Sequence, residues 1–598
     1  MWRENVQYIL KGSTMLNAGF LKSVLPASAR ELIRNGLSRG LATSGMSQGF
    51  KQANIVILDK KFADDFEQFC LANSGPLPLL YRSKPGEWSS PPLSTSSDIR
   101  TDCPQYIKYE RGNIAGNLSS LVEYTEQLKD MVTFYLGCSF SFESALLKAD
   151  IPVRNIEQGR NISAFKTSIP CVSVGGFQCN MVVTMRPIPV DKLDAVVQVT
   201  HRMKDAHGAP VHIGHPEPGL AFTHAPGCMF ITDLQSEQEV ASDFAADAEI
   251  PHVFCISQNP IHYSVASVAA VEKFKALDSL IQQDPGNRGI KHLLIEKQLL
   301  KACLSLSNAK SVLITTGFPT HFNNQPPEET DGPPGAIAIA AMLQAQKKNV
   351  VIVTDQRALE MNRKIIEEAV EQGRLKTPVP IVSFQDNGKD SALMFLCHDG
   401  NPQFPRFDHL IAIERAGMAA DGNYYNARKV NIKHLVDPID KLFLKAQDIP
   451  GISTTGIGDG GNELGMGKVK EAVKKYINNG DLIACDVEAD FTVIAGVSNW
   501  GGYAVACGLY ILNSCAIHER YLRKALGFPM TSEMVGYILA LPTVQKEEKL
   551  LELLVKHGIR SGKTGNLGME VDGLLFHDTH SSMIRQLLEI TLGQAQST

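Results

Sequence analysis

A glycine-rich acidic loop at residues 456–468 carries the residue types best suited to chemistry. It holds six glycines and the polar groups of Asp459, Asn462 and Glu463. Glycine relaxes the restriction on φ, so backbone amides can close on a small ligand that these side chains also contact. A P-loop is excluded, because Val469 stands where that motif needs Ser or Thr. The loop therefore predicts a small-molecule site, and the alternative is a tight structural turn.

A second polar stretch, residues 414–428, could recognise a carboxylate. It begins with Glu414 and Arg415 and continues through Asn423 to a second arginine. Arginine can bind a carboxylate with two parallel hydrogen bonds, and asparagine offers a donor and an acceptor in a fixed frame. The alternative is a turn that carries only a surface ion pair.

The elements that must position these residues form an α/β pattern in the C-terminal half. Short apolar segments alternate with helical ones, including an alanine-rich helix that opens at Pro333. This pattern predicts a mostly parallel, doubly wound sheet. The expected strands lie at residues 311–317, 349–355, 380–384, 409–414, 481–486 and 491–496.

Ligands of such sheets bind beyond the carboxyl ends of the strands. That rule brings together residues 315–320, Asp355, Glu414 with Arg415, and residues 498–502. We expect the loop at 459–463 to join them. Carboxylates, an arginine and glycine-rich turns on one rim suit a small polar substrate or a divalent ion that holds one.

The chain's 598 residues exceed what one hydrophobic core usually organises, so we expect two domains. The N-terminal part, residues 52–305, mixes proline and polar turns with expected strands at 171–174 and 180–185, and is predicted to be mixed α/β or α+β. The C-terminal domain is placed at 306–598.

Composition gives no electrostatic case for nucleic acid, since the net charge is −5. Apolar runs fall short of the roughly twenty residues that span a bilayer, which predicts no membrane insertion. Residues 1–46 are basic and amphipathic, as in a mitochondrial transit peptide, and we expect cleavage between residues 38 and 47 and a location in the mitochondrial matrix. The alternative is a disordered tail.

Longer motifs give a resemblance to known families. Residues 314–321, 326–335, 413–417, 421–428 and 457–463 resemble the C-terminal domain of the D-glutamate cyclases. Residues 98–102, 135–143, 184–187, 210–214 and 224–227 resemble a related hydro-lyase family. Together these motifs span nearly all of the chain after the predicted presequence.

The N-terminal domain departs from the family pattern. After Gly214 the family continues with further segments, whereas here the chain leads almost directly to His224. We therefore expect this domain to be abbreviated and its site to be impaired if the absent stretch lines the pocket.

The resemblance implies an intramolecular dehydration, in which the amine of D-glutamate attacks its own side-chain carboxyl group to give 5-oxo-D-proline and water. This chemistry needs a base, a proton for the leaving hydroxyl and donors for two carboxylates, and it requires no redox or carrier cofactor. Glu414, Asp459 and Glu463 are the expected acid and base residues. Arg415 is the expected carboxylate clamp.

Further substrate contacts are expected from Asn423, Asn462 and, in the N-terminal domain, Arg186. The amides of Gly460 and Gly461 could stabilise an oxyanion. A divalent cation held by Asp459 and Glu463 is an open alternative.

Two other functions stay open from the sequence: a non-catalytic metabolite sensor, and an enzyme that binds a nucleotide or a sugar phosphate at the same rim. The sequence does not give the oligomeric state.

Overall fold

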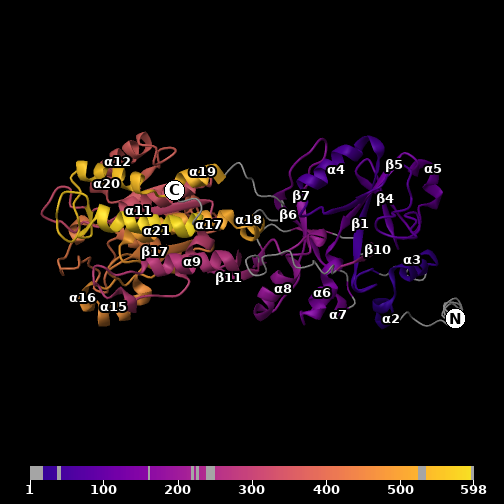
Figure 1. The fold of residues 1–598 in the computed structure, drawn as a ribbon, viewed down its shortest axis with the longest axis horizontal. Helices are drawn as coiled ribbons and strands as arrows, with labels where there is room; N and C mark the ends of the chain where they lie inside the picture. The colour runs from indigo at the N-terminus through magenta and orange to yellow at the C-terminus, as the bar shows by residue number, and fades with distance from the viewer. Residues whose placement is uncertain are drawn as a thin grey trace. The chain divides into compact units, whose positions relative to one another are not determined.

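The computed structural model describes most of the chain, namely residues 18–36, 42–158, 160, 162–216, 221–223, 228–236, 250–522 and 534–593. The chain forms two compact units, and the second contains Phe254–Leu522 together with the residues from 534 onward (Figure 1). Both combine helices and strands, so the predicted two-domain α/β architecture is confirmed.

The C-terminal unit is built on a six-stranded sheet in the order β15-β14-β13-β16-β17-β18. Every neighbouring pair is parallel, as predicted. The order reverses between β13 and β16, which is the switch point where such sheets bind ligands. The strands are β13 Ser311–Gly317, β14 Asn349–Thr354, β15 Ile381–Ser383, β16 His409–Arg415, β17 Ser453–Gly458 and β18 Phe491–Ile494.

One predicted strand of this sheet is wrong. Residues 481–486 begin in the short helix α16 (Gly480–Ile483), and the fifth strand is instead β17. Its threonines and glycines hide it from an apolar pattern, but all six residues are buried between β16 and β18. The loop at 459–463 thus directly follows a strand end.

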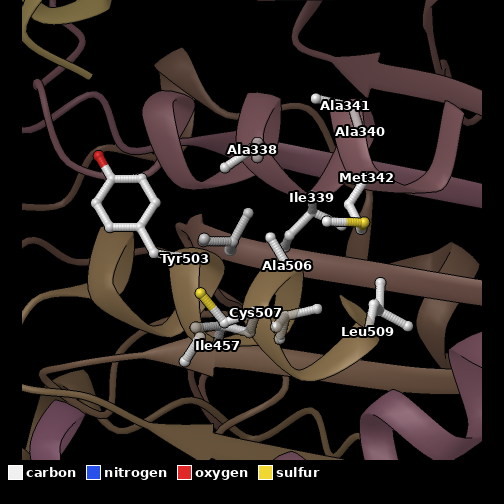
Figure 2. Close-up of a cluster of buried hydrophobic side chains, with 14 of the residues drawn as sticks. Ala338, Ile339, Ala340, Ala341, Met342, Ile457, Tyr503, Ala506, Cys507 and Leu509 are labelled. Atoms are coloured by element: carbon white, nitrogen blue, oxygen red, sulfur yellow. The ribbon is translucent and has the colours of Figure 1, made fainter. Parts of the chain in front are cut away.

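Successive residues of a strand pack into two separate hydrophobic cores, one on each face of the sheet. Val312 and Ile314 pack in the core that includes α11 (Pro333–Ala345) and α17 (Ser498–Ser514). Leu313, between them, belongs to the core on the other face. Figure 2 shows Ile339 and Met342 of α11 directed toward the turn of α17 that carries Ala506. The side-chain period of two therefore makes the sheet doubly covered.

The remaining helices of this unit complete the two layers. They are α9 Val268–Ile281, α10 Gln298–Asn308, α12 Leu359–Glu371, α13 Ser391–Leu396, α14 Asp440–Ala446, α15 Lys470–Tyr476, α18 Ala516–Leu522, α19 Met534–Ala540, α20 Val544–Lys556 and α21 Ser581–Leu592.

Helices α9 and α10 place the domain boundary earlier than residue 306. Phe274 and Cys303 lie so close to α17 that a Cβ on Gly508 would come within 2.8 Å of both side chains. These helices share one hydrophobic core with the sheet. The C-terminal unit therefore begins near Phe254 rather than at 306.

The N-terminal unit is α+β. Its main sheet has the order β10-β1-β5-β2 with antiparallel pairing, and β6 and β7 pair in another sheet. Of the two strands predicted here, β7 is confirmed at 180–184. Residues 171–173 have no regular secondary structure, and Val174 forms only an isolated bridge with Phe177. The bounds are β1 Phe50–Asp59, β2 Leu79–Arg82, β3 Tyr106–Glu110, β4 Asn113–Leu118, β5 Met131–Gly137, β6 Ala164–Pro170, β7 Asn180–Thr184, β10 Phe230–Gln235, α4 Ala63–Ala72, α6 Glu143–Lys148 and α8 Leu193–Thr200.

Helix α3 (Pro26–Arg34) is part of the folded N-terminal unit. Arg30 is fully buried and pairs with Asp233 at 2.9 Å, while Arg34 binds both carboxylate oxygens of buried Asp102 at 2.5 and 2.8 Å. Cleavage between residues 38 and 47 would remove this helix and leave Asp102 without those partners. The predicted end of the presequence at residue 46 therefore does not fit the fold.

A search of the described residues for membrane spans yields no single helix of sufficient length and apolarity. One pair, α17 with α18, meets the criteria only when joined across an 85° bend. Helix α17 is nearly all buried in the C-terminal core.

Candidate active site

The carboxyl ends of β13, β16 and β17 lie side by side, and an acidic cluster forms at this edge from the end of β16, the loop after β17 and the segment before α11. One side-chain oxygen each from Asp331, Glu414 and Asp459 lies within 4.8 Å of the others. The three residues are 1%, 6% and 1% exposed. Glu414 and Asp459 were predicted to share this rim, and the structure brings them together.

Glu414 adopts an unusual backbone conformation, with φ of 40°. The register of β16 against β13 shifts at this point, between Thr316 and Gly317. A Cβ on Gly332, whose φ is 101°, would lie 2.7 Å from the Cβ of Glu414 and 2.6 Å from the Thr316 hydroxyl. Only glycine permits this approach, so backbone strain and a tight contact fix the Glu414 side chain.

Asp331 joins the starts of two helices. It follows the predicted proline-rich tract, and its carboxylate accepts the backbone N–H groups of Ser498 (2.9 Å) and Asn499 (2.8 Å) at the start of α17. Asn499 in turn accepts the N–H groups of Gly332 (3.0 Å) and Gly335 (2.9 Å) at the start of α11. The two helix N-termini favour negative charge at this point.

One hydrogen bond and two ion pairs orient the other acids of the site. Ser498 donates its hydroxyl to Glu414 at 2.6 Å. Arg288 binds both Asp459 and Asp572 through its guanidinium group. Arg288 lies in the loop between α9 and α10, so the helices before residue 306 supply the cation of the site.

Crowding of acids in a buried place raises their pKa values. Burial, with Glu463 and Asp331 nearby, raises the pKa of Glu414 well above its usual value. Burial also raises the pKa of Asp459, although Arg288 opposes the shift. The pKa of Asp331 rises to about 6, through burial and the charge of Asp572. Burial and neighbouring acids raise the pKa of Glu329 as well.

Glu463 has a different place from the one predicted. Its carboxylate accepts the backbone N–H groups of Asp459 at 3.0 Å, Gly460 at 2.6 Å and Gly461 at 2.6 Å. It therefore holds the glycine-rich loop closed. In this structure Glu463 therefore occupies the donors for which an oxyanion role was predicted, the amides of Gly460 and Gly461.

Arg415 is not a substrate clamp in this structure. It is fully buried and binds both oxygens of Asp355 at 2.7 Å, with a further bond to the Asp437 carbonyl at 3.0 Å. The two residues were predicted to share the rim, and they do, but as partners of each other. These bonds occupy both terminal nitrogens of Arg415, whereas its Nε has no partner among the described residues.

The two asparagines predicted to bind substrate serve the loops instead. Asn423 bonds within its own turn, to Asp421 at 2.9 Å and Tyr425 at 3.4 Å. Asn462 donates to the Tyr425 carbonyl at 3.0 Å and so ties the glycine-rich loop to that turn. The alternative of a structural turn is the better description of residues 421–425.

Arg186 lies in the other unit and forms a polar cluster there. It donates to Glu143 and to Asn155, both at 3.1 Å, and lies over the ring of Phe142. Burial lowers the pKa of Arg186, although the charge of Glu143 opposes the shift. Cys138 lies in the motif at residues 135–143, which also contains Glu143. Burial raises the pKa of Cys138 to about 12, which makes it a poor nucleophile. Residues 224–227, also part of the resemblance, lie outside the described residues.

Sequence reasoning missed Arg288, Asp331 and Asp572. Asp331 had a usable signal, since it stands just before the proline pair that opens α11. Ser498 lay within the predicted strand-end segment but was given no role. Nothing in the sequence pattern marked Arg288 or Asp572 as a site residue. Both lie in loops that are distant in sequence from the strands of the sheet.

Comparison with known proteins agrees with this architecture. The family model described as "D-glutamate cyclase-like, C-terminal" matches residues 277–588, and the model "D-glutamate cyclase" matches residues 132–219. Because the first match begins at residue 277, the C-terminal family model includes α10 and Arg288.

Individual relatives cover the whole chain or its N-terminal part. "D-glutamate cyclase, mitochondrial" of Homo sapiens is 53% identical over 96% of this chain and 99% of its own length. A "Putative hydro-lyase" of Stutzerimonas stutzeri is 38% identical over 37% of this chain and 98% of its own length. A protein with the same description from Bacillus licheniformis is 40% identical over 36% of this chain and 96% of its own length. The chain therefore belongs to the D-glutamate cyclase family.

Proposed function

We propose that this chain is a hydro-lyase that converts D-glutamate into 5-oxo-D-proline and water. Family membership supports the reaction, because a relative named for this activity matches along nearly the full length of both chains. The buried acidic cluster of Asp331, Glu414 and Asp459 supports assigning the reaction to the C-terminal rim.

The reaction moves protons as well as forming a bond. The nitrogen–carbon bond of the lactam forms, and one carbon–oxygen bond of the side-chain carboxyl group breaks. Two protons leave the substrate ammonium group, and both depart with the lost oxygen as water. Such a transfer needs groups that accept and donate protons, and carboxyl groups beside the reacting atoms can do both.

The cluster also bears on how the substrate is held. Arg288 is the cation of the cluster, and its side chain is 25% exposed, so it can contact a ligand at the rim while it stays bound to Asp459 and Asp572. We assign Glu414 and Asp459 to the acid–base or electrostatic part of the reaction. Arg288 replaces Arg415 as the proposed contact to a substrate carboxylate.

A nucleotide or sugar-phosphate function has less support. The sheet has the strand order typical of nucleotide-binding folds. However, the amides that would cradle a phosphate bind Glu463, and the rim carries more acids than cations. A phosphate would meet repulsion there. A sensor that binds D-glutamate without turnover would use the same rim, and a turnover measurement distinguishes it from an enzyme.

We also propose that the chain acts in the mitochondrial matrix. The human relative is described as mitochondrial. The basic N-terminal segment supports import, with the removable part ending before α3 rather than at residue 46.

The proposal is tested with the chain from Ala18 onward, incubated with D-glutamate or L-glutamate while 5-oxoproline is followed by chiral chromatography. We expect product from the D-isomer. Glu414→Gln and Asp459→Asn should each lower kcat by roughly a hundredfold or more, the scale of a lost acid, base or electrostatic group.

Asp448→Asn, which changes an exposed acid on the same unit, is the matched control and should keep normal turnover. Normal turnover in both rim variants would move the chemistry to the Arg186 cluster of the N-terminal unit. Saturable D-glutamate binding without product would identify a sensor.

A further inference from the structure

Two buried polar atoms at the acidic cluster have no hydrogen-bond partner among the described residues. They are Oδ2 of Asp459 and the hydroxyl oxygen of Thr316, and their residues are 1% and 8% exposed. Thr316 lies beside Glu414, since both would crowd a Cβ on Gly332. Buried polar atoms nearly always have a partner, so these two offer a ligand or a water two unused oxygens at the cluster.

The charge of the cluster indicates the sign of that ligand. Asp331, Glu414 and Asp459 converge there, and Glu463 and Asp572 are close enough to affect their pKa values. Arg288 faces these acids, and it already binds Asp459 and Asp572. Uncompensated buried acids are costly, and a cation would remove the mutual repulsion.

The three acids are also held in fixed positions before any ligand arrives. Helix-start amides hold Asp331, the Ser498 hydroxyl holds Glu414, and Arg288 holds Asp459. Outer contacts of this kind orient metal ligands. No histidine or cysteine joins the group in the described part of the chain, so its donors are oxygen atoms.

We propose that Asp331, Glu414 and Asp459 bind one divalent cation of the magnesium and manganese class. Hard cations of this class prefer carboxylate oxygens and keep several waters, so three protein ligands at a strand-end rim suffice. The metal site does not require cyclase activity. One part rests on the proposed function: the open positions of the ion receive a carboxylate oxygen of D-glutamate, which brings an anionic substrate to an acidic rim.

The test measures Mn²⁺ binding by the electron paramagnetic resonance signal of the free ion, on the chain from Ala18 onward after treatment with a chelator. We expect one bound Mn²⁺ per chain, which Mg²⁺ displaces. Asp459→Asn and Asp331→Asn should each weaken binding at least tenfold. Asp448→Asn should bind like the unchanged chain.

Folding of each variant is checked by near-ultraviolet circular dichroism. If an Asp variant does not fold, the unchanged chain still tests the metal site. Its Tm must rise as the Mn²⁺ concentration increases, because Mn²⁺ binds the folded state. Absence of both binding and a Tm shift at millimolar Mn²⁺ would overturn the proposal, as would unchanged affinity in both folded Asp variants.

Turnover measured in parallel separates this proposal from the proposed function. Chelated enzyme that still forms 5-oxoproline and binds no Mn²⁺ would overturn the metal site and leave the cyclase intact. Site-specific Mn²⁺ binding without product from D-glutamate would uphold the metal site and contradict the cyclase.

Discussion

The role of each arginine in this chain follows from its partners. Arg415 and Arg288 both bind two acceptor groups, but Arg415 is fully buried with Asp355, whereas Arg288 is partly exposed at the acidic rim. The sequence correctly placed Arg415 at the carboxyl edge of the sheet. It could not show that Asp355 binds it, because Asp355 follows β14 and β13 lies between β14 and β16.

Replacement of Arg415 tests its structural role. Arg415→Met leaves the buried Asp355 carboxylate without its main partner, so we expect a loss of about 3–5 kcal/mol in the free energy of unfolding. Urea unfolding measures this loss. Arg363→Met, at an exposed helical ion pair, should change stability by less than about 0.5 kcal/mol. A stable Arg415→Met variant with weakened D-glutamate binding would restore the clamp assignment.

His580 gives the C-terminal unit a pH-dependent stability. It accepts the Trp500 indole N–H at 3.0 Å and faces the Val571 carbonyl at 3.2 Å, and burial lowers the pKa of His580 to about 4. The unfolded chain binds this proton below about pH 6.5, but the folded chain does not until about pH 4. Stability therefore falls as pH decreases below 6.5, with a slope of up to about 1.4 kcal/mol per pH unit.

His580→Gln isolates this effect. The difference in free energy of unfolding between the unchanged chain and the variant should shrink by about 1 kcal/mol when urea titrations at pH 6.5 and pH 5.5 are compared. An equal difference at both values would mean that His580 keeps its proton in the folded state.

At the level of helices and strands, the sequence predicted five of the six strands of the C-terminal sheet. The remaining strand, β17, was not predicted because Gly456 interrupts its apolar pattern. A Cβ there would lie 2.7 Å from the Cα of Gly465, so the returning glycine-rich loop requires glycine inside a central strand. That contact is tertiary, and the pattern of a single strand does not contain it.

Helices α11 and α17 meet through two glycines, and this contact sets the place of Asp331 and Ser498. A Cβ on Gly502 would lie 2.5 Å from the Cα of Gly335. Gly502→Ala should push the helices apart and cost roughly 1–3 kcal/mol, with reduced turnover. Thermal unfolding measures the change.

The control for this variant is Gly536→Ala in α19, where nothing lies within 4 Å of the added Cβ. That change should leave stability unaltered or raise it by about 0.5–1 kcal/mol, because alanine favours a helix more than glycine does. Equal losses in both variants would argue against a specific contact between α11 and α17.

At the scale of the whole chain, the boundary of the C-terminal unit can be tested with two fragments. A fragment of residues 250–598 keeps α9, α10 and Arg288, and we expect it to unfold cooperatively. A fragment of residues 306–598 exposes the surface of α17 that Phe274 and Cys303 cover, and loses about 1.5–3 kcal/mol for each large apolar side chain removed from the core.

The shorter fragment should therefore be insoluble or only partly folded, which circular dichroism and gel filtration detect. A well-folded fragment 306–598 would contradict the boundary near Phe254. The sequence placed this boundary too late because α9 and α10 precede the first strand of the alternating pattern, and only their packing on α17 assigns them to it.

The crowded acids of the rim have a consequence for heat resistance. In a chelator, folded Glu414 holds a proton that the unfolded chain releases above about pH 4.5, so stability falls as pH rises, by up to about 1.4 kcal/mol per pH unit. Glu414→Gln removes this penalty, and its Tm should exceed that of the unchanged chain by more at pH 8 than at pH 5. A laboratory selection for thermostable forms of this chain would therefore enrich variants that lack the Glu414 carboxyl group, and these variants would have lost turnover.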